Sequence, residues 1–390
     1  MAEQLEKKYT NEMLKEMQSW DLDRKIATSL TRIAEFTNHF NNQVCVFFSG
    51  GKDSTVLLDL VRKVVPDVPV VFSNTGLEYP EIQAFAREKG AEFVRPKMMF
   101  NEVITKYGYP IISKEVSHSV YYARKIINNI WDLKRGKLKT IRSRLDLLNK
   151  RPLETGKDFW EVVNKKTKKH NFEETHSIYN IKKYLPLAQN IPVLISAKCC
   201  SIMKKTPISN NNTTKKFHPF LGTLADESRL RKKAWLLHGC NAFDSKKITS
   251  QPLSFWTEQD ILQYIIEKDI DICSVYGEIE RLDNGKLHCT GCQRTGCVFC
   301  GYGAHLEKNG EERFLRLRDT HPKQYNYCIN GGQWADNPYY DPEASTEPDE
   351  MGWVNWNPKK IWTPSKEGLG FGVVFDYLNA EYGDNFIRYK

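Results

Sequence analysis

Residues 48–55, Phe-Ser-Gly-Gly-Lys-Asp-Ser-Thr, decide the fold of this chain. They follow an apolar run, 44–48, and precede an amphipathic run, 56–61, which together predict a buried strand, a glycine turn and a helix. Glycine lets the backbone turn sharply and approach a ligand closely. The first turn of a helix has free N–H groups at the positive end of its dipole, and these bind phosphate. We therefore expect a phosphate site, to which Lys52 adds a mobile positive charge.

The hexapeptide 49–54, Ser-Gly-Gly-Lys-Asp-Ser, is distinct from a Walker A loop, because Asp53 stands where that loop has Ser or Thr. It resembles the PP-loop of the ATP-pyrophosphatase-type adenine nucleotide α-hydrolases. The resemblance implies an enzyme that acts at the α-phosphate of an adenine nucleotide. It also implies nucleotide contacts from Ser49, Gly50, Gly51, Lys52, Asp53 and Ser54. The alternative is a strand–turn–helix corner in which the glycines serve only the turn.

The pattern around the loop predicts an α/β fold with a doubly wound parallel sheet. Residues 1–40 have helical periodicity, and strand-like runs at 44–48, 68–72 and 91–94 alternate with helical ones such as 80–89. A further strand is expected at 193–195, and a helix at 257–268 begins with Thr257 as its N-cap. Because ligands bind at the carboxyl ends of parallel strands, residues 49–55 and 73–78 should face one pocket.

Composition divides the chain into three predicted parts: N-terminal helices (1–40), a PP-loop nucleotide-binding α/β domain (41–305) and an irregular C-terminal capping segment (306–390). A basic helical insertion, 120–185, has 17 Lys and Arg against 7 Asp and Glu, so it accounts for the chain's net charge of +9. Its interleaved aromatics favour RNA or DNA as a partner, and a solvated helical face is the alternative. No apolar run has the length of a membrane span, so we expect a cytoplasmic protein without a membrane partner.

The cysteines are clustered as in a metal or redox site. Cys199 and Cys200 are adjacent, and Cys289, Cys292, Cys297 and Cys300 form two CxxC pairs within twelve residues. CxxC spacing turns two sulfurs toward one metal centre, as in zinc and iron–sulfur sites. One ligand set is Cys199, Cys200, Cys297 and Cys300, and the alternative set is Cys289, Cys292, Cys297 and Cys300. A vicinal pair suits the wide spacing of a [4Fe–4S] cluster better than a single Zn²⁺, which stays the alternative.

The motif CCxxxKxxP at 199–207 with the later Cys297-x-x-Cys300 resembles the cluster signature of the iron–sulfur adenylylsulfate/phosphoadenylylsulfate (APS/PAPS) reductase family. Segments 74–81, 222–231 and 252–260 resemble further motifs of that family in the same order. The resemblance implies that Cys199, Cys200, Cys297 and Cys300 hold a [4Fe–4S] cluster. It implies that Lys52, Ser54, Thr75, Gly76, Ser228 and Arg231 line the nucleotide site. We expect Lys52, Asp53 and Arg231 to be catalytic, because preorganised cations and donors stabilise charge on a leaving phosphate. ATP, APS or PAPS is the expected nucleotide, with Mg²⁺ as a further candidate.

Two departures from the family pattern leave the reaction open. Leu224 stands where the family has an arginine, and no cysteine follows Cys328 to act as a C-terminal nucleophile. One hypothesis is therefore a reductase of an adenylylated sulfate, with a thioredoxin-like reductant or sulfur donor as partner. The second is an ATP-dependent sulfurtransferase that thiolates tRNA or DNA. The third is a non-catalytic nucleotide-binding accessory protein.

Overall fold

The computed structural model describes residues 8–118, 190–243, 247–308, 310–344 and 356–390, with the single residues 120, 121, 124, 184, 187, 245 and 347. The basic insertion predicted at 120–185 lies almost wholly outside the described residues. The chain divides into two units, each built from two segments: unit 1 is Met1–Lys97 with Ile202–Val298, and unit 2 is Met98–Ser201 with Phe299–Lys390. These units cut the chain at places other than the expected domain boundaries, which stay predictions.

Unit 1 is built on a six-stranded sheet with the order β3-β2-β1-β5-β7-β6. All neighbours are parallel except β6, which runs antiparallel to β7. The strands are β1 (Val44–Phe48), β2 (Val70–Ser73), β3 (Glu92–Val94), β5 (His218–Leu221), β6 (Asn241–Ala242) and β7 (Thr249–Ser250). The central strand β1 is apolar along its whole length because a central parallel strand is covered on both faces.

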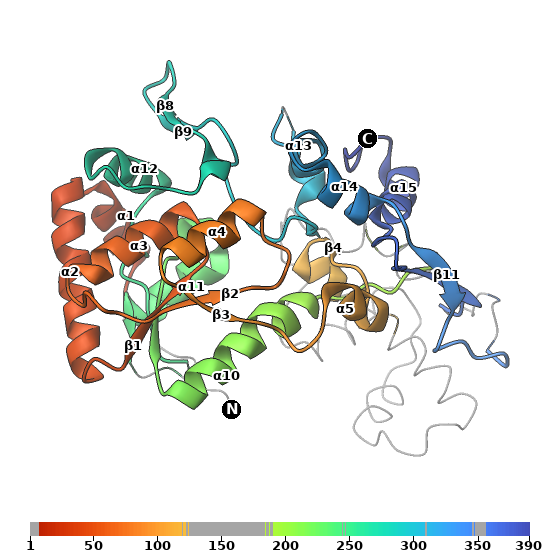
Figure 1. Ribbon diagram of the computed structural model, residues 1–390, viewed down its shortest axis with the longest axis horizontal. Helices are drawn as coiled ribbons and strands as arrows, with labels where there is room; N and C mark the ends of the chain where they lie inside the picture. Colours follow the sequence, from red (N-terminus) through yellow and green to blue (C-terminus); the bar gives the residue numbers. More distant parts are fainter. Residues whose placement is uncertain are drawn as a thin grey trace. The chain divides into compact units, whose positions relative to one another are not determined.

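Helices cover this sheet on both faces. They are α1 (Asn11–Ser19), α2 (Leu22–His39), α3 (Lys52–Arg62), α4 (Pro80–Glu88), α10 (Thr206–Lys215), α11 (Arg229–His238) and α12 (Glu258–Glu267). Figure 1 shows α3 and α4 above the strands and α10 below them. Helix α3 also contacts α2 and α12, and α10 contacts β3. The hairpin of β8 (Ile279–Arg281) and β9 (Leu287–Cys289) follows α12.

The strand order reverses beside β1: the chain goes from β1 outward to β2 and β3, and returns to β5 on the other side. In an open parallel sheet such a switch point leaves a crevice at the carboxyl ends of the two central strands, where ligands bind. The loop that follows β1 carries residues 49–51, and the loop that follows β5 begins at Gly222. The fold therefore brings the PP-loop and the segment 222–231 to the same crevice.

Unit 2 has smaller sheets, and its described part has fewer helices than unit 1. Its strands are β4 (Ile111–Ile112), β10 (Gly301–Tyr302), β11 (Gln333–Asp336) and β12 (Lys360–Thr363), and its helices are α5 (Phe100–Tyr107), α13 (Arg313–Thr320), α14 (Pro322–Ile329) and α15 (Phe371–Tyr382). Strands β4 and β10 pair in parallel, and β11 and β12 pair antiparallel. The core gathers around Phe375, whose ring lies 4.8 Å from Phe314 and 5.4 Å from Phe371.

Most sequence expectations agree with these elements, and two need correction. The α/β class with a largely parallel sheet is confirmed, and β1, α4 and α12 lie where they were predicted. The run 193–195 is not a sheet strand: Val193 and Ile195 form only isolated bridges. The C-terminal segment is not irregular, because α13, α14 and α15 give it regular helical structure. No helix within the described ranges is long and apolar enough to span a membrane.

Candidate active site

The PP-loop has the tight turn that its glycines predict. Gly50 has φ +71°, and a Cβ there would lie 2.7 Å from Ile82 Cγ2, so only glycine fits without strain. The hydroxyl of Ser54 accepts a hydrogen bond from Ser49 N at 3.2 Å and donates to Gly51 O at 2.8 Å. These bonds fold the loop back onto the first turn of α3. The loop is thus held in shape with the helix N-terminus facing the crevice.

Lys52 is tied down by two partners that the hexapeptide does not contain. Its Nζ lies 2.5 Å from Glu258 Oε1 and donates to Gln293 O at 2.9 Å. Lys52 is only 5% exposed, while the Glu258 side chain is 48% exposed. Next along α3, Asp53 Oδ1 is buried and has no hydrogen-bond partner in the described part of the chain. Burial raises the pKa of Asp53, and the positive charge of Lys52 opposes that shift.

The loop after β2 supplies the second wall of the site. Thr75 donates to Glu78 from its N–H at 3.0 Å and from its hydroxyl at 2.7 Å. Gly76, with φ +75°, donates its N–H to Asn74 Oδ1 at 3.0 Å. The Glu78 carboxylate also lies 3.4 Å from Lys204 Nζ. Thr75 and Gly76 therefore shape the loop, and the buried Glu78 carboxylate pairs there with Lys204, which comes from another segment.

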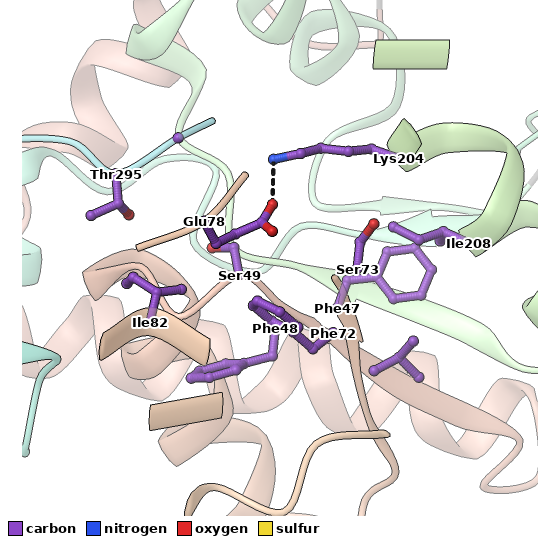
Figure 2. Close-up of a pocket in the computed structure, with 12 residues that line it drawn as sticks. Phe47, Phe48, Ser49, Phe72, Ser73, Glu78, Ile82, Lys204, Ile208 and Thr295 are labelled. Carbon is purple, nitrogen blue, oxygen red and sulfur yellow. Dashed lines mark ion pairs between the residues drawn. The ribbon is translucent and has the colours of Figure 1, made fainter. Parts of the chain in front are cut away.

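A cavity of about 150 Å³ opens between the carboxyl ends of β1 and β2. Figure 2 shows Glu78 and Lys204 paired at one side of this cavity, with Ser49 and Ser73 nearby. The hydroxyl of Ser73 is buried and, within the described ranges, has no hydrogen-bond partner. The apolar part of the cavity lining consists of Phe47, Phe48, Val71, Phe72, Ile82 and Ile208. A mostly apolar pocket with a few polar groups is typical of a small-molecule site.

The loop after β5 meets the PP-loop from the other side. A Cβ on Gly222 would lie 3.0 Å from the backbone of Asp53, so the two loops touch through their backbones. Ser228 is the N-cap of α11 and accepts from Arg231 N at 3.2 Å. The guanidinium of Arg231 forms an ion pair with Glu227. Ser228 thus fixes the start of α11, and Arg231 brings a positive charge toward α3.

The segment 289–298 ties these loops together, which the cysteine spacing did not predict. Besides the Gln293 carbonyl on Lys52, Thr295 Oγ1 lies 2.7 Å from the Tyr276 hydroxyl, which in turn accepts from Lys52 N at 3.4 Å. Val298 N donates to Leu77 O at 2.7 Å. Thr295 and the next residue, Gly296, line the cavity. Cys297 therefore directly follows a residue that lines the cavity.

The cysteines fall into two groups. In unit 2, the Sγ atoms of Cys199 and Cys200 are 3.9 Å apart, and burial together with the nearby thiols of Cys199, Cys200 and Cys300 raises the pKa of Tyr302. Two sulfurs on one tetrahedral zinc ion are about 3.8 Å apart, so this spacing keeps Zn²⁺ as an alternative. No group of three or more His, Cys, Asp or Glu side chains in the described residues is arranged as a finished metal site.

In unit 1, Cys289 and Cys292 are buried, and Cys292 Sγ lies 3.9 Å from the Tyr79 hydroxyl. Burial raises the pKa of Cys289, and the charge of Lys52 opposes this shift. In the first predicted ligand set, the thiols of Cys199, Cys200 and Cys300 all contribute to the raised pKa of one side chain, Tyr302. The fourth member of this set, Cys297, precedes Cys300 by three residues in the sequence.

Comparison with known proteins identifies the family. A model described as phosphoadenosine phosphosulfate reductase domain matches residues 43–115 and 138–302, which is more than half of the chain. The chain belongs to this family. The match confirms the resemblance seen in the motifs and places this reductase-family chain among PP-loop, nucleotide-binding enzymes related to sulfur metabolism.

Two individual proteins are also similar to this reductase-family chain. An uncharacterized protein of Methanocaldococcus jannaschii is 22% identical over 310 residues, which are 79% of this chain and 52% of that protein. The chain thus spans about half the length of this curated relative. The crystal structure of phosphoadenylyl-sulfate reductase from Candida auris, a phosphate complex, superposes with a TM-score of 0.32 and 11% identity over 74% of this chain and 98% of that one.

Sequence reasoning and structure agree on which loops meet, and differ on what the side chains do there. The predicted residues lie either on the loops at the carboxyl ends of β1, β2 and β5 (49–51, Thr75, Gly76 and Ser228) or in the first turn of the helix that follows (52–54 in α3 and Arg231 in α11). The carboxylates of Glu78, Glu227 and Glu258 were missed as parts of the site, although each pairs with one of its cations. Leu224 is buried, as suits a leucine where the family has an arginine.

Replacing Glu258 by glutamine should strengthen binding of AMP about two- to fivefold, because the amide no longer neutralises the Lys52 ammonium. The gain is small because the Glu258 carboxylate is half exposed. Calorimetric titration with AMP measures it. Glu267→Gln, at the far end of α12, is the control and should change nothing. Weaker binding in Glu258→Gln would mean that Glu258 positions Lys52 rather than competing with phosphate.

Proposed function

We propose that the chain is a reductase of an adenylylated sulfate, which it holds by its adenylate part at the switch point of unit 1. One observation carries this proposal: the PP-loop and the loop after β2 line a cavity near the N-terminus of α3, and the loop after β5 touches α3 from the other side. Membership of the reductase family supports the same substrate class.

Each group at the crevice has a role in this proposal. The apolar cavity between β1 and β2 takes the adenosine. The Ser73 hydroxyl, which has no hydrogen-bond partner among the described residues, offers it a hydrogen bond. The α-phosphate binds at the N–H groups of residues 50–54, where the helix dipole favours an anion. Lys52 and Arg231 then stabilise the charge that develops on the adenylate as it leaves. The backbone N–H groups and the two cations are in place before the substrate binds, so little reorganisation of the site is needed during the reaction.

The reduction needs two thiols. A thiolate attacks the sulfate sulfur, the bond from sulfur to the bridging oxygen breaks, and AMP leaves with the electron pair (the 3′-phosphorylated nucleotide leaves if the substrate is PAPS). A second thiol then attacks the resulting thiosulfonate, which releases sulfite and forms a disulfide. Attack by thiolate requires an accessible, ionised thiol.

The chain has no exposed thiol outside the proposed cluster ligands. Six cysteines lie outside the set Cys199, Cys200, Cys297 and Cys300, and each is 7% exposed or less: Cys45, Cys240, Cys273, Cys289, Cys292 and Cys328. Burial raises the pKa of Cys328 well above its usual range, which keeps it a neutral thiol. We therefore assign both thiols of the reduction to a thioredoxin-like dithiol partner.

Cys199, Cys200, Cys297 and Cys300 are the proposed ligands of a [4Fe–4S] cluster, with Zn²⁺ as the alternative metal. The short distance between the Cys199 and Cys200 sulfurs, and the effect of the Cys199, Cys200 and Cys300 thiols on the pKa of Tyr302, support this set over the one with Cys289 and Cys292. Thiolates are the usual ligands of such clusters. When bound, the cluster supplies a redox-active, sulfur-rich centre. The residues of the chain bind the nucleotide and stabilise its leaving phosphate.

The lack of an exposed nucleophilic thiol also favours a second candidate, an ATP-dependent sulfurtransferase that thiolates tRNA or DNA. In that reaction the PP-loop binds ATP, with Mg²⁺ as a companion ion, and an oxygen of the nucleic acid is adenylylated. The basic segment 120–185 is then the candidate contact to the phosphate backbone.

Equilibrium binding of APS, PAPS and ATP, each with and without RNA or DNA, separates the two candidates. The reductase predicts tight binding of a sulfonucleotide that nucleic acid does not change. A preference for ATP, with salt-sensitive binding of nucleic acid, would replace it by the transferase. Binding of none of the three nucleotides would contradict both.

A further inference from the structure

Arg294 is held over the crevice by the residues on either side of it. On one side, Gln293 O accepts a hydrogen bond from Lys52 Nζ at 2.9 Å. On the other, Thr295 Oγ1 lies 2.7 Å from the Tyr276 hydroxyl. The backbone at Arg294 is therefore fixed next to the first turn of α3, while its side chain is 67% exposed. An exposed arginine on a fixed backbone is free to meet a ligand at small cost in ordering.

Arg294 and Arg231 share one carboxylate. Nη2 of Arg294 lies 4.0 Å from Glu227 Oε1, beyond hydrogen-bond distance, and Arg231 forms an ion pair with the same side chain. Glu227 Oε2 also accepts a hydrogen bond from the N–H of Leu224 at 3.0 Å. Burial and the like charge of Arg294 lower the pKa of Arg231. The buried Asp53 carboxylate, whose pKa burial raises, also interacts with both guanidinium groups. An oxyanion that replaced Glu227 would meet both arginines at once.

The position of this arginine pair decides which part of a nucleotide it meets. The cavity lies on the β2 side of the PP-loop, and Glu227 and Arg231 follow β5 on its other side. The N-terminus of α3 lies between them, because Gly222 touches the backbone of Asp53. A nucleotide with its adenosine in the cavity and its α-phosphate at α3 extends its next acidic group toward the arginines.

We propose that Arg294, together with Arg231, binds the acidic group that is joined to the α-phosphate of the adenylate. The ligand class is thus an adenylate acid anhydride, in which that group is a sulfate or a β-phosphate. Both are tetrahedral oxyanions that accept paired hydrogen bonds from a guanidinium. An oxyanion bound there would take the place of the Glu227 carboxylate beside the two guanidinium groups. The inference rests on the proposed function and adds a residue that distinguishes substrate from the product AMP.

The test is the affinity of the full chain for AMP, ADP and APS, measured by calorimetry at fixed salt. The wild type should bind APS or ADP about tenfold or more tightly than AMP, as a charge-assisted pair of hydrogen bonds requires. Arg294→Ala should reduce this preference to less than about threefold and leave the affinity for AMP unchanged. The control is Arg281→Ala, which removes the same charge from a guanidinium bonded to Gly285 O in the β8–β9 hairpin. It should keep the preference.

The outcomes separate this inference from the function on which it rests. An unchanged preference in Arg294→Ala, or an equal loss of AMP affinity, would overturn the inference and leave the proposed function standing. So would a wild type that binds AMP as tightly as both anhydrides. If the wild type binds no adenine nucleotide, the proposed function fails and the inference fails with it. Comparison of APS with ADP shows which oxyanion the arginines bind.

Discussion

Replacing Lys52 by alanine should lower the rate of nucleotide cleavage about a hundredfold to a thousandfold, the usual effect of removing one preorganised donor from a developing negative charge. Lys52 is the cation of the first turn of α3, where we expect the α-phosphate to bind. The fold should persist, because the partner that loses its ion pair, Glu258, is half exposed and becomes hydrated. Initial rates of AMP formation give the size of the effect, and thermal unfolding checks the fold.

Lys63→Ala is the matched control for this change. It removes the same charge at the other end of α3, where Lys63 pairs with Asp59 at 2.8 Å and is far from the loop. The control should keep normal turnover. If Lys52→Ala also retained normal turnover and nucleotide affinity, the assignment of the PP-loop as the catalytic phosphate site would be wrong.

Replacing Cys200 or Cys300 by serine should remove most of the metal from the anaerobically purified protein. A serine hydroxyl is a much poorer ligand for iron or zinc than a thiolate, and a site with four ligands loses its stability when one is lost. With a [4Fe–4S] cluster the wild type is brown and contains iron and sulfide, and both variants become pale. Metal and sulfide analysis together with the visible absorption spectrum measure this.

The same experiment decides between the two ligand sets. Cys289→Ser and Cys292→Ser should keep the metal, because both thiols are buried and neither is among those that raise the pKa of Tyr302. Cys240→Ser is the control for a cysteine outside both ligand sets and should keep the metal. The Cys240 thiol accepts a hydrogen bond from Ser254. Loss of metal in Cys289→Ser with retention in Cys200→Ser would establish the alternative set. A colourless wild type with stoichiometric zinc would replace iron by zinc.

The central sheet of unit 1 could be predicted because its signals are local. The run 44–48 is apolar at every position, as is typical of a strand that is buried on both faces. A glycine turn and the helix α3 follow it directly. The N-cap of α12 at Thr257 was likewise visible in the sequence and is confirmed by the bond that its side chain accepts from Asp260 N. Strand–helix alternation then fixed the parallel topology and the edge at which the loops meet.

The ion pairs of the site could not be predicted in the same way, because their partners are distant in sequence. Lys52 and Glu258 are 206 residues apart, and nothing in the motif around either residue names the other. The hexapeptide suggested a lysine ready for phosphate, whereas in the folded chain its ammonium is held by a carboxylate and a backbone carbonyl. Arg294 was not predicted as a site residue, because it lies between Cys292 and Cys297, whose spacing indicates metal binding.

Helix α15 of unit 2 was not predicted, for a compositional reason. After residue 330 the chain is rich in Trp, Pro, Gly and Asp, which favours turns, and this obscured the apolar spacing of Phe371, Val374, Phe375 and Leu378. That spacing puts all four side chains on one face of α15, and all four are buried. A search for period 3.6 in short windows would have found this helix.

If the crevice of unit 1 cleaves an adenylylated sulfate, as we propose, the reaction releases sulfite and an adenylate, and both products can be measured. The full chain, purified without oxygen, is incubated with APS or PAPS and a dithiol reductant. We predict release of sulfite together with an equal amount of AMP or its 3′-phosphorylated form, and loss of both products in Lys52→Ala. An untouched sulfonucleotide, with ATP converted to AMP and pyrophosphate only when RNA or DNA is present, would contradict the claim.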